Sequence, residues 1–146
     1  MNGKKVPLLK GHAKYYYHVL TILASYKERS FSYTINDESA SSDLILMTIG
    51  NGTTFGGGFK LMPDAKIDDG FLEVCKIGAI SAVRRFLNIS KLSNGSHGRL
   101  SEVSFEKAKS VRIDKNDLLY AHADGEDIGQ PPYDIQILPK ALTLRI

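Results

Sequence analysis

The sequence predicts a mainly β domain, α+β overall, with about two helices. Two segments repeat apolar residues every three or four positions, which is the period of a helix. Elsewhere, and above all after residue 100, short apolar runs alternate with turn residues, a pattern typical of a β-sandwich or a barrel. The 146 residues are enough for one domain, and no repeat or linker divides residues 1–146.

The N-terminal part of the chain contains the first expected helix and the first expected strand. Residues 12–29 are predicted to be helical because their apolar side chains form one stripe. The stripe consists of Tyr16, Val19, Leu20, Leu23 and Tyr26. Residues 31–35 alternate apolar and polar side chains, which predicts a half-buried strand, and Asn36-Asp37 predicts the turn that follows it.

The middle of the chain predicts two more strands and the second helix. Residues 44–49 (LILMTI) form an almost continuous apolar run, as expected of a strand buried on both faces. Residues 71–77 predict the next strand, in which Cys75 is expected to be a small buried apolar residue. Residues 80–92 have helical periodicity. The side chains of this helix expected to be buried are Val83, Phe86 and Leu87, with Ile89 or Leu92 as a further candidate.

The last third of the chain is predicted to be β-structure. A polar segment, residues 93–100, is expected to be a loop. The strands expected after it are 102–105, 110–113, 118–123, 133–138 and 142–146.

Composition excludes several classes of protein. There are 19 lysines and arginines against 16 acids, and the net charge of +3 is too small to indicate binding to nucleic acid. No apolar run approaches the roughly 20 residues of a membrane span, and the N-terminus lacks the apolar stretch of a signal peptide. Cys75 is the only cysteine, which excludes internal disulfides and a CxxC metal site. We therefore expect a cytoplasmic location.

Charge is unevenly distributed along the chain. Residues 79–113 carry seven basic and two acidic side chains, a net of +5, whereas residues 114–134 carry six acidic and one basic, a net of −5. Such a surface could attract an anionic membrane and hold a cation, and an ordinary mixed surface is the alternative. Three histidines lack the spacing of metal ligands and are expected on the surface or on a helix face. They are His12, His18 and His97.

A glycine-rich segment, residues 50–59 (GNGTTFGGGF), is not a nucleotide-binding loop. A Walker loop ends in Gly-Lys-Ser/Thr, and a dinucleotide-binding loop opens a helix; neither feature is found in this segment. Its glycines indicate a strand end at which the backbone turns or approaches another group closely.

Two acidic segments are candidate sites. Residues 63–70 (PDAKIDDG) lack the spacing of an EF-hand, yet one carboxylate among main-chain carbonyls can hold a hard cation. In residues 122–127 (HADGED), Asp124 and Glu126 are close enough to share proton-transfer or metal chemistry. A plain Asp-Gly turn is the alternative for both segments.

Taken in order, these segments resemble one known family. The run GNGTTFGGGFKLMPDAKIDDGFLEV, the helix after it, the segment AHADGED and the terminal LPKALTLRI resemble the C-terminal domain of diacylglycerol kinase-like lipid kinases. These are the soluble bacterial type, related to sphingosine kinases and more distantly to NAD kinases. The segment LLKGHAKYYYHVLTIL resembles the start of that domain, so the resemblance covers essentially the whole chain. Its most specific part is FGGGFKLMPDAKIDDG.

The resemblance implies a β-sandwich fold and a part in phosphoryl transfer. In this family, the γ-phosphoryl group of ATP passes to a lipid hydroxyl in a cleft between two domains. By resemblance, Asp69 supplies a carboxylate to a structural Mg²⁺, and the main-chain carbonyls of Lys66 and Phe71 complete the protein ligands. Also by resemblance, Glu126 is the general base on the lipid hydroxyl. Asp124 helps to position Mg²⁺ or its bound water at the phosphates.

The sequence departs from the family in one respect. The Gly-Gly-Asp-Gly-Thr loop of the family's N-terminal nucleotide-binding domain does not occur in it. We therefore expect residues 1–146 to be a single C-terminal β-sandwich domain without the nucleotide-binding domain. On its own it should not phosphorylate lipid, because phosphoryl transfer depends on positioning both substrates. The expected partners are that N-terminal domain and a lipid at the membrane surface; an unpaired sheet edge could also promote a homodimer.

Two other functions remain open at this point. One is a stand-alone β-sandwich that binds lipid or a membrane surface without catalysis, using the basic stretch. The other is a kinase domain whose acceptor is a long-chain base. A location in the cytoplasm, peripheral to the membrane, suits all three functions.

Overall fold

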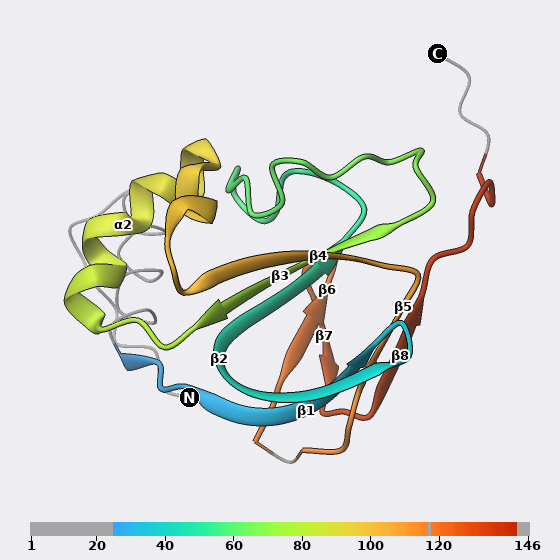
Figure 1. Ribbon diagram of the computed structural model, residues 1–146, viewed down its shortest axis with the longest axis horizontal. Coiled ribbons are helices and arrows are strands. Elements are labelled where there is room, and N and C mark those ends of the chain that lie inside the picture. Colours follow the sequence, from blue (N-terminus) through green and yellow to red (C-terminus); the bar gives the residue numbers. More distant parts are fainter. Residues whose placement is uncertain (1–24, 117, 143–146) are drawn as a thin grey trace.

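The computed structural model describes residues 25–116 and 118–142, which form a mostly β domain (Figure 1). Six antiparallel strands make one sheet in the order β4-β3-β2-β1-β5-β8, and β6 and β7 pair separately. The strands are β1 (Arg29–Ile35), β2 (Glu38–Gly50), β3 (Leu72–Gly78), β4 (Val103–Ala108), β5 (Ser110–Ile113), β6 (Ala121–Ala123), β7 (Glu126–Gly129) and β8 (Tyr133–Gln136). The helices are α2 (Ala82–Asn94) and the 3₁₀ helix η1 (Ser96–Arg99).

The long strand β2 is what turns one sheet into a sandwich. Its first half pairs with β1 and its second half pairs with β3, and a register shift lies between Leu44 and Leu46. A bulge of this kind bends a strand and increases its twist. Figure 1 shows β2 curving between the two halves. The expected β-sandwich with helices is confirmed.

The main core fills the space between the two halves of the bent sheet. One half of the sheet contributes alternate residues of β1 and β5 to this core. The other half contributes Val74 of β3 and Ala108 of β4. The alternation that predicted β1 is therefore correct, since Phe31, Tyr33 and Ile35 are all buried.

A smaller core lies on the other side of β3. Met62, Cys75, Ile77 and Ile80 are buried there, and Leu92 of α2 packs against them. Because Val74 points into the main core and Cys75 into the smaller one, β3 is buried on both faces. Residues 44–49 were expected to have this property, but Leu46, at the register shift of β2, is 41% exposed.

The helix α2 begins and ends at clear signals. The Ser81 side chain accepts a hydrogen bond from the Arg84 amide, and Gly95 ends the helix in the left-handed conformation (φ 81°). The expectation that Val83, Phe86 and Leu87 point inward is wrong: all three are exposed. The helix is fixed to the sheet by its other side, through Leu92.

Other boundaries differ from the sequence prediction in several places. Residues 12–24 of the first expected helix lie outside the described residues; residues 26–28 are not helical, and β1 already begins at Arg29. Part of the expected loop 93–100 is η1, and the strand expected at 118–123 begins only at Ala121. Strand β7 was not predicted. Leu142 is not in a strand, and residues 143–146 are outside the described residues.

His97 is a partial correction: it lies on the 3₁₀ helix η1, but it is completely buried rather than on the surface. Its Nε2 lies 3.1 Å from the Leu61 carbonyl oxygen and 3.9 Å from Cys75 Sγ. Its ring stands edge-on to Phe105, with 5.4 Å between ring centroids. His97 therefore joins η1 to the smaller core. Cys75 is buried as expected, and burial raises the pKa of its thiol to about 11, so it remains protonated.

Candidate functional site

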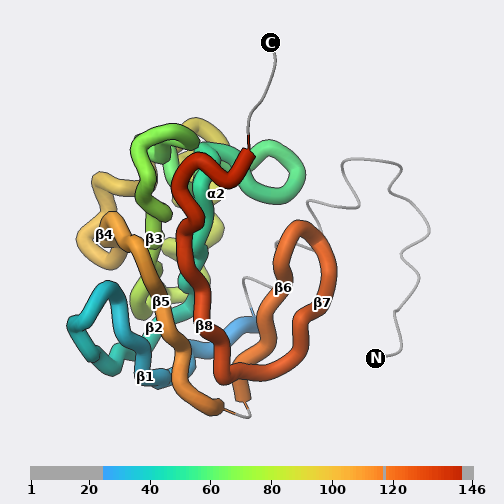
Figure 2. The backbone as a smooth tube through the Cα atoms, turned by 90° about the vertical axis from the view of Figure 1, so that its right-hand side faces the viewer, coloured from blue at the N-terminus to red at the C-terminus, as the bar shows by residue number. Residues whose placement is uncertain are grey.

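The predicted site residues lie in two places on the fold. Asp69, Lys66 and Phe71 belong to the loop of residues 51–71 that connects β2 to β3. Asp124 and Glu126 lie at the turn between β6 and β7. Figure 2 shows the β6–β7 hairpin standing beside β8, apart from the main sheet.

The Asp69 carboxylate is fixed by two donors of different kinds. Its Oδ1 accepts the amide hydrogen of Phe71 at 3.0 Å, which closes a tight turn of the Asx type. Gly70, between them, has a φ of +75°, a conformation that favours glycine. Oδ2 accepts a hydrogen bond from Lys107 Nζ of β4 at 2.5 Å. The local sequence Asp-Gly-Phe and the neighbouring strand together determine where this carboxylate points.

These contacts shift the pKa values of the charged side chains around Asp69. The hydrogen bond from Lys107, followed by that from the Phe71 amide, holds the pKa of Asp69 below its ordinary value, and Asp69 in turn raises the pKa of Lys107. On β3, Glu73 is opposite Lys107 in the strand register, and burial raises the pKa of its carboxyl. Asp69 is therefore an anion at neutral pH, already next to one cation.

Asn51 brings the other two predicted ligands together. One end of its side-chain amide lies 3.3 Å from the Lys66 carbonyl oxygen and 3.2 Å from the Phe71 carbonyl oxygen. The other end lies 3.3 Å from the Ile67 carbonyl oxygen. Three main-chain carbonyls of the loop thus converge on a single side chain. From the sequence, Asn51 was noted as part of the glycine-rich segment, and this position among the loop carbonyls was not predicted.

The donor set of this loop suits a hard divalent cation. Mg²⁺ prefers oxygen ligands and is usually held by one or two carboxylates with several waters. The loop offers the Asp69 carboxylate and the converging carbonyls of Lys66 and Phe71. Within residues 25–116 and 118–142, no group of three or more His, Cys, Asp or Glu side chains could hold a metal ion. Such a site would therefore depend on main-chain oxygens, as the resemblance implied.

The β6–β7 turn presents two carboxylates to solvent. Asp124 and Gly125 are the two turn residues, with φ values of 51° and 92°, and Ala123 pairs with Glu126 across the hairpin. Two successive positive φ values are characteristic of the type I′ turn, which Asp-Gly favours. Asp127 is engaged differently, because its Oδ1 accepts the Gly129 amide hydrogen at 2.8 Å. The Asp-Gly turn, which the sequence offered as the alternative for this segment, is present in the hairpin, and Asp124 and Glu126 are exposed at its tip.

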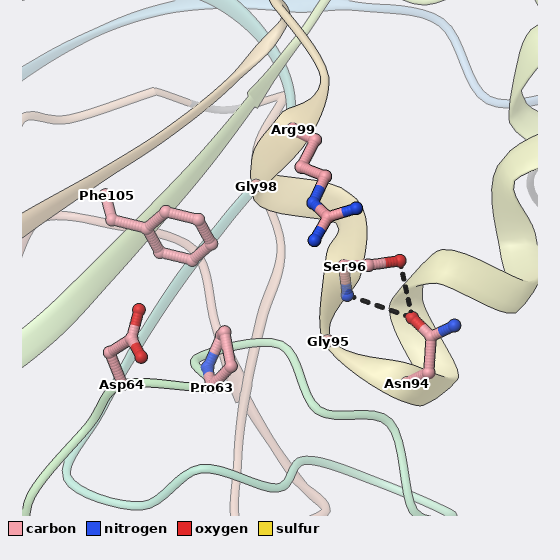
Figure 3. A pocket seen from close by; sticks show the side chains of 8 residues that line it. All are labelled: Pro63, Asp64, Asn94, Gly95, Ser96, Gly98, Arg99 and Phe105. Carbon is pink, nitrogen blue, oxygen red and sulfur yellow. Dashed lines mark hydrogen bonds between the residues drawn. The ribbon is translucent and has the colours of Figure 1, made fainter.

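The structure joins neither carboxylate of the hairpin to the Asp69 loop by a hydrogen bond or an ion pair within the described ranges. A hollow elsewhere on the surface contains none of the five predicted site residues. It has a volume of about 410 Å³ and lies between the residue 63–64 turn and the segment 94–99 (Figure 3). Among the parts of the chain that the structure describes, no helix is long and apolar enough to cross a membrane.

Comparison with known proteins identifies the family. A family described as the YegS C-terminal NAD kinase beta sandwich-like domain matches residues 2–146. A protein named diacylglycerol kinase from Mycobacterium tuberculosis (strain CDC 1551 / Oshkosh) is 29% identical over 133 residues, which is 90% of this chain and 43% of the relative. A protein named "Probable lipid kinase YegS-like" from Yersinia pestis (strain Pestoides F) is 32% identical over 97% of this chain and 47% of the relative.

A solved structure agrees on the fold. The crystal structure described as a diacylglycerol kinase from Bacillus anthracis str. Sterne superimposes with a TM-score of 0.67 at 24% identity, covering 88% of this chain and 44% of that one. The chain thus spans somewhat less than half the length of the relatives it matches. On the match over residues 2–146, this chain belongs to the family of YegS C-terminal, NAD kinase-like β-sandwich domains.

Proposed function

We propose that this chain is the acceptor-side domain of a lipid kinase that transfers the γ-phosphoryl group of ATP to a diacylglycerol-like hydroxyl. The observation that carries this proposal is the family match over residues 2–146, together with relatives named diacylglycerol kinase and lipid kinase. The chain covers under half of those relatives, so the nucleotide is assigned to a separate N-terminal domain that works with this one.

The hairpin carboxylates are the proposed catalytic groups. Glu126 acts as general base and takes the proton of the lipid hydroxyl as that oxygen attacks the γ-phosphorus, the bond to the β,γ-bridging oxygen breaks and ADP leaves. Asp124 would help to position a metal or its bound water at the phosphates. Their environment supports these roles. Both side chains are exposed, and no hydrogen bond or ion pair occupies them within the described part of the chain. A type I′ turn keeps the two carboxylates on a short, defined hairpin.

The Asp69 loop is the proposed magnesium site, with a structural role. Asp69 would supply the carboxylate, and Lys66 and Phe71 would supply their main-chain carbonyl oxygens. Bound there, Mg²⁺ supplies positive charge that holds these oxygens together. Residues of the chain already stabilise part of this arrangement. The Lys107 ammonium is hydrogen-bonded to the Asp69 carboxylate, and the Asn51 amide lies within hydrogen-bond distance of the Lys66 and Phe71 carbonyl oxygens. These residues keep the loop of residues 51–71 close to β3 and β4.

The lipid acceptor places the protein at a membrane surface, in the cytoplasm. Basic residues between 79 and 113, net +5, support attraction to anionic lipid. The isolated chain is expected to be inactive, since the Gly-Gly-Asp-Gly-Thr run of the nucleotide-binding loop does not occur in its sequence.

The test joins this chain in frame to the nucleotide-binding domain of a lipid kinase of the same family. Magnesium-dependent transfer from ATP is then measured with diacylglycerol and with a long-chain base. We expect transfer to diacylglycerol, none by the isolated chain, and a loss of about 100-fold or more in kcat in Glu126→Gln and Asp124→Asn, as removal of a general base implies.

Asp127→Asn is the matched control. It removes one charge from the same hairpin, while its amide oxygen can still accept the Gly129 amide hydrogen. Equal losses in all three variants would mean that the hairpin acts through its net charge and not through a specific base. Transfer to the long-chain base and not to diacylglycerol would show that the acceptor is a long-chain base. A fusion that binds lipid vesicles but transfers nothing to either lipid would favour a binding domain without catalysis.

A further inference from the structure

Two Asn-Gly pairs of the described chain place their asparagine amides in opposite surroundings. An asparagine that precedes glycine readily loses its side-chain amide, because glycine has no side chain to hinder ring closure by its main-chain nitrogen. The sequence contains three such pairs, Asn2-Gly3, Asn51-Gly52 and Asn94-Gly95, and the structure describes the second and third. The groups around each amide therefore decide which of these two asparagines reacts faster in the folded chain.

Asn94, the last residue of α2, has two donors on its side-chain carbonyl. Its Oδ1 accepts hydrogen bonds from the Ser96 amide at 2.9 Å and from the Ser96 hydroxyl at 2.6 Å (Figure 3). Its Nδ2 points away from Ser96 and has no hydrogen bond among the described residues. The side chain is exposed, so water reaches it. Two donors on one carbonyl oxygen stabilise negative charge that develops there, as in an oxyanion hole.

Asn51 has the same following residue but lacks such donors. The groups within hydrogen-bond distance of its amide are the main-chain carbonyl oxygens of Lys66, Ile67 and Phe71. Carbonyl oxygens accept hydrogen bonds and cannot donate them, so none of the three stabilises charge on the Asn51 oxygen. The Asn51 nitrogen donates to these oxygens and is held in place. Crowding does not protect this pair, since a Cβ atom at Gly52 would meet nothing within 4 Å.

We propose that Asn94 is a site of spontaneous deamidation. The Gly95 nitrogen attacks Asn94 Cγ and gives up its proton, which closes a succinimide ring; the bond from Cγ to Nδ2 breaks, and Nδ2 takes up the proton and leaves as ammonia. Water then opens the ring at either carbonyl and leaves aspartate or isoaspartate at position 94. The bonds from Ser96 lower the barrier of the first step, because they strengthen as Oδ1 becomes an oxyanion. This proposal does not depend on the proposed kinase function.

Either product changes the end of α2. Aspartate places a new carboxylate at the hollow between the residue 63–64 turn and the segment 94–99, which Arg99 also lines. Isoaspartate also adds a methylene group to the main chain just before Gly95. Close by, the Lys60 amide donates to the Leu92 carbonyl oxygen at 2.9 Å and ties the β2–β3 loop to the helix. The Lys60 amide hydrogen should therefore exchange severalfold faster in the isoaspartyl form, and unchanged exchange would overturn this consequence.

Peptide mapping by mass spectrometry tests the proposal on the full chain. The protein is incubated at mildly alkaline pH, folded and in urea, and conversion of amide to acid is followed at both asparagines. We expect Asn94 to react severalfold faster than Asn51 in the folded chain and the two rates to become similar in urea. Equal or slower reaction of Asn94 in the folded chain would overturn the proposal. The same rate ratio in urea would assign the difference to local sequence and not to the fold.

Ser96→Ala tests the contribution of the hydroxyl donor. We expect deamidation of Asn94 to slow severalfold in this variant, while the rate at Asn51 stays unchanged and shows that the fold is retained. Ser93→Ala is the matched control, because it makes the same substitution on the other side of Asn94, where the exposed serine side chain has no hydrogen bond to the amide among the described residues. An unchanged or faster reaction of Asn94 in Ser96→Ala would contradict activation by Ser96.

Discussion

Lys107 Nζ on β4 lies 2.5 Å from Asp69 Oδ2, so the carboxylate proposed as a magnesium ligand already has a cation of the chain itself beside it. The same carboxylate accepts the Phe71 amide hydrogen through its other oxygen. A divalent cation at Asp69 must therefore share this carboxylate with Lys107 or displace its ammonium. The ammonium is half-exposed, which makes displacement into water possible.

Replacing Lys107 with Met should change both the titration of Asp69 and its affinity for Mg²⁺. Lys107 is the largest cause of the lowered pKa of Asp69, so that pKa should rise towards its ordinary value of 3.8 in Lys107→Met. Removing a nearby positive charge should also tighten Mg²⁺ binding severalfold. An NMR titration of the Asp69 carboxyl carbon measures the first effect, and calorimetric titration with Mg²⁺ measures the second.

Lys109→Met is a control for this experiment. Both lysines lie over the ring of Phe71, with Nζ 5.7 Å (Lys107) and 5.5 Å (Lys109) from its centroid, but only Lys107 bonds to Asp69. Lys109→Met should leave the Asp69 titration almost unchanged. Weaker Mg²⁺ binding in Lys107→Met would contradict the idea that the ammonium and the metal compete.

Asn51 should contribute to cation binding through its position among the loop carbonyls. Leu has a similar shape but has no N–H group to donate to the carbonyl oxygens of Lys66 and Phe71. We expect Asn51→Leu to weaken Mg²⁺ binding about 10-fold or more, the usual effect of losing a residue that orients metal ligands. Binding is followed by the amide NMR signals of Gly70 and Phe71. Asn88→Leu on α2 serves as the control, and an unchanged affinity in Asn51→Leu would exclude this role.

Sequence reasoning located most strands because their signals are local. The alternation in 31–35 and the Asp-Gly pair at residue 124 depend only on neighbouring residues, and both predictions are confirmed. The short strand β7 was missed because its residues, Glu126–Gly129, are mostly polar; only the pairing across the turn makes them a strand.

Errors arose where the answer depends on distant residues. Periodicity located α2 but could not show which of its two apolar sides meets the sheet, and Leu92 rather than Phe86 does so. The burial of His97 depends on Leu61 and on Cys75, 22 residues away. Asn51 was not recognised because the carbonyls around it come from residues 66–71. The Asp-Gly signal indicated a turn at the proposed catalytic carboxylates, Asp124 and Glu126, whereas their catalytic roles remain a proposal.

Glu73 should make stability depend on pH. Burial raises the pKa of its carboxyl in the folded state above the ordinary value of 4.5. A raised pKa means that the protonated side chain favours folding; this contribution is fully present below 4.5 and is lost as the pH rises through the folded-state pKa. Glu73→Gln should therefore be more stable than the parent at neutral pH, and the difference should vanish below 4.5.

Urea unfolding at the two pH values measures this difference. Glu38→Gln at the exposed start of β2 is the control and should change stability little at either pH. Lower stability of Glu73→Gln at neutral pH would mean that the attraction between Glu73 and Lys107 outweighs the burial of the charge.

Gly95, at the end of α2, should tolerate alanine poorly for two separate reasons. Its φ of +81° is unfavourable for alanine by about 1–2 kcal/mol. A Cβ atom there would also lie 3.1 Å from Pro63 Cβ, in a turn whose backbone is fixed by the bond from the Lys60 amide to the Leu92 carbonyl. Strain and crowding therefore act together, and Gly95→Ala should lower the free energy of unfolding by about 2 kcal/mol, measured by urea unfolding. Gly52→Ala is the matched control, since a Cβ atom at residue 52 would meet nothing within 4 Å and its expected change is within about 0.5 kcal/mol. Equal stabilities of the two variants would show that the end of α2 can relax around a side chain, and that Gly95 is not needed to hold the helix against the loop.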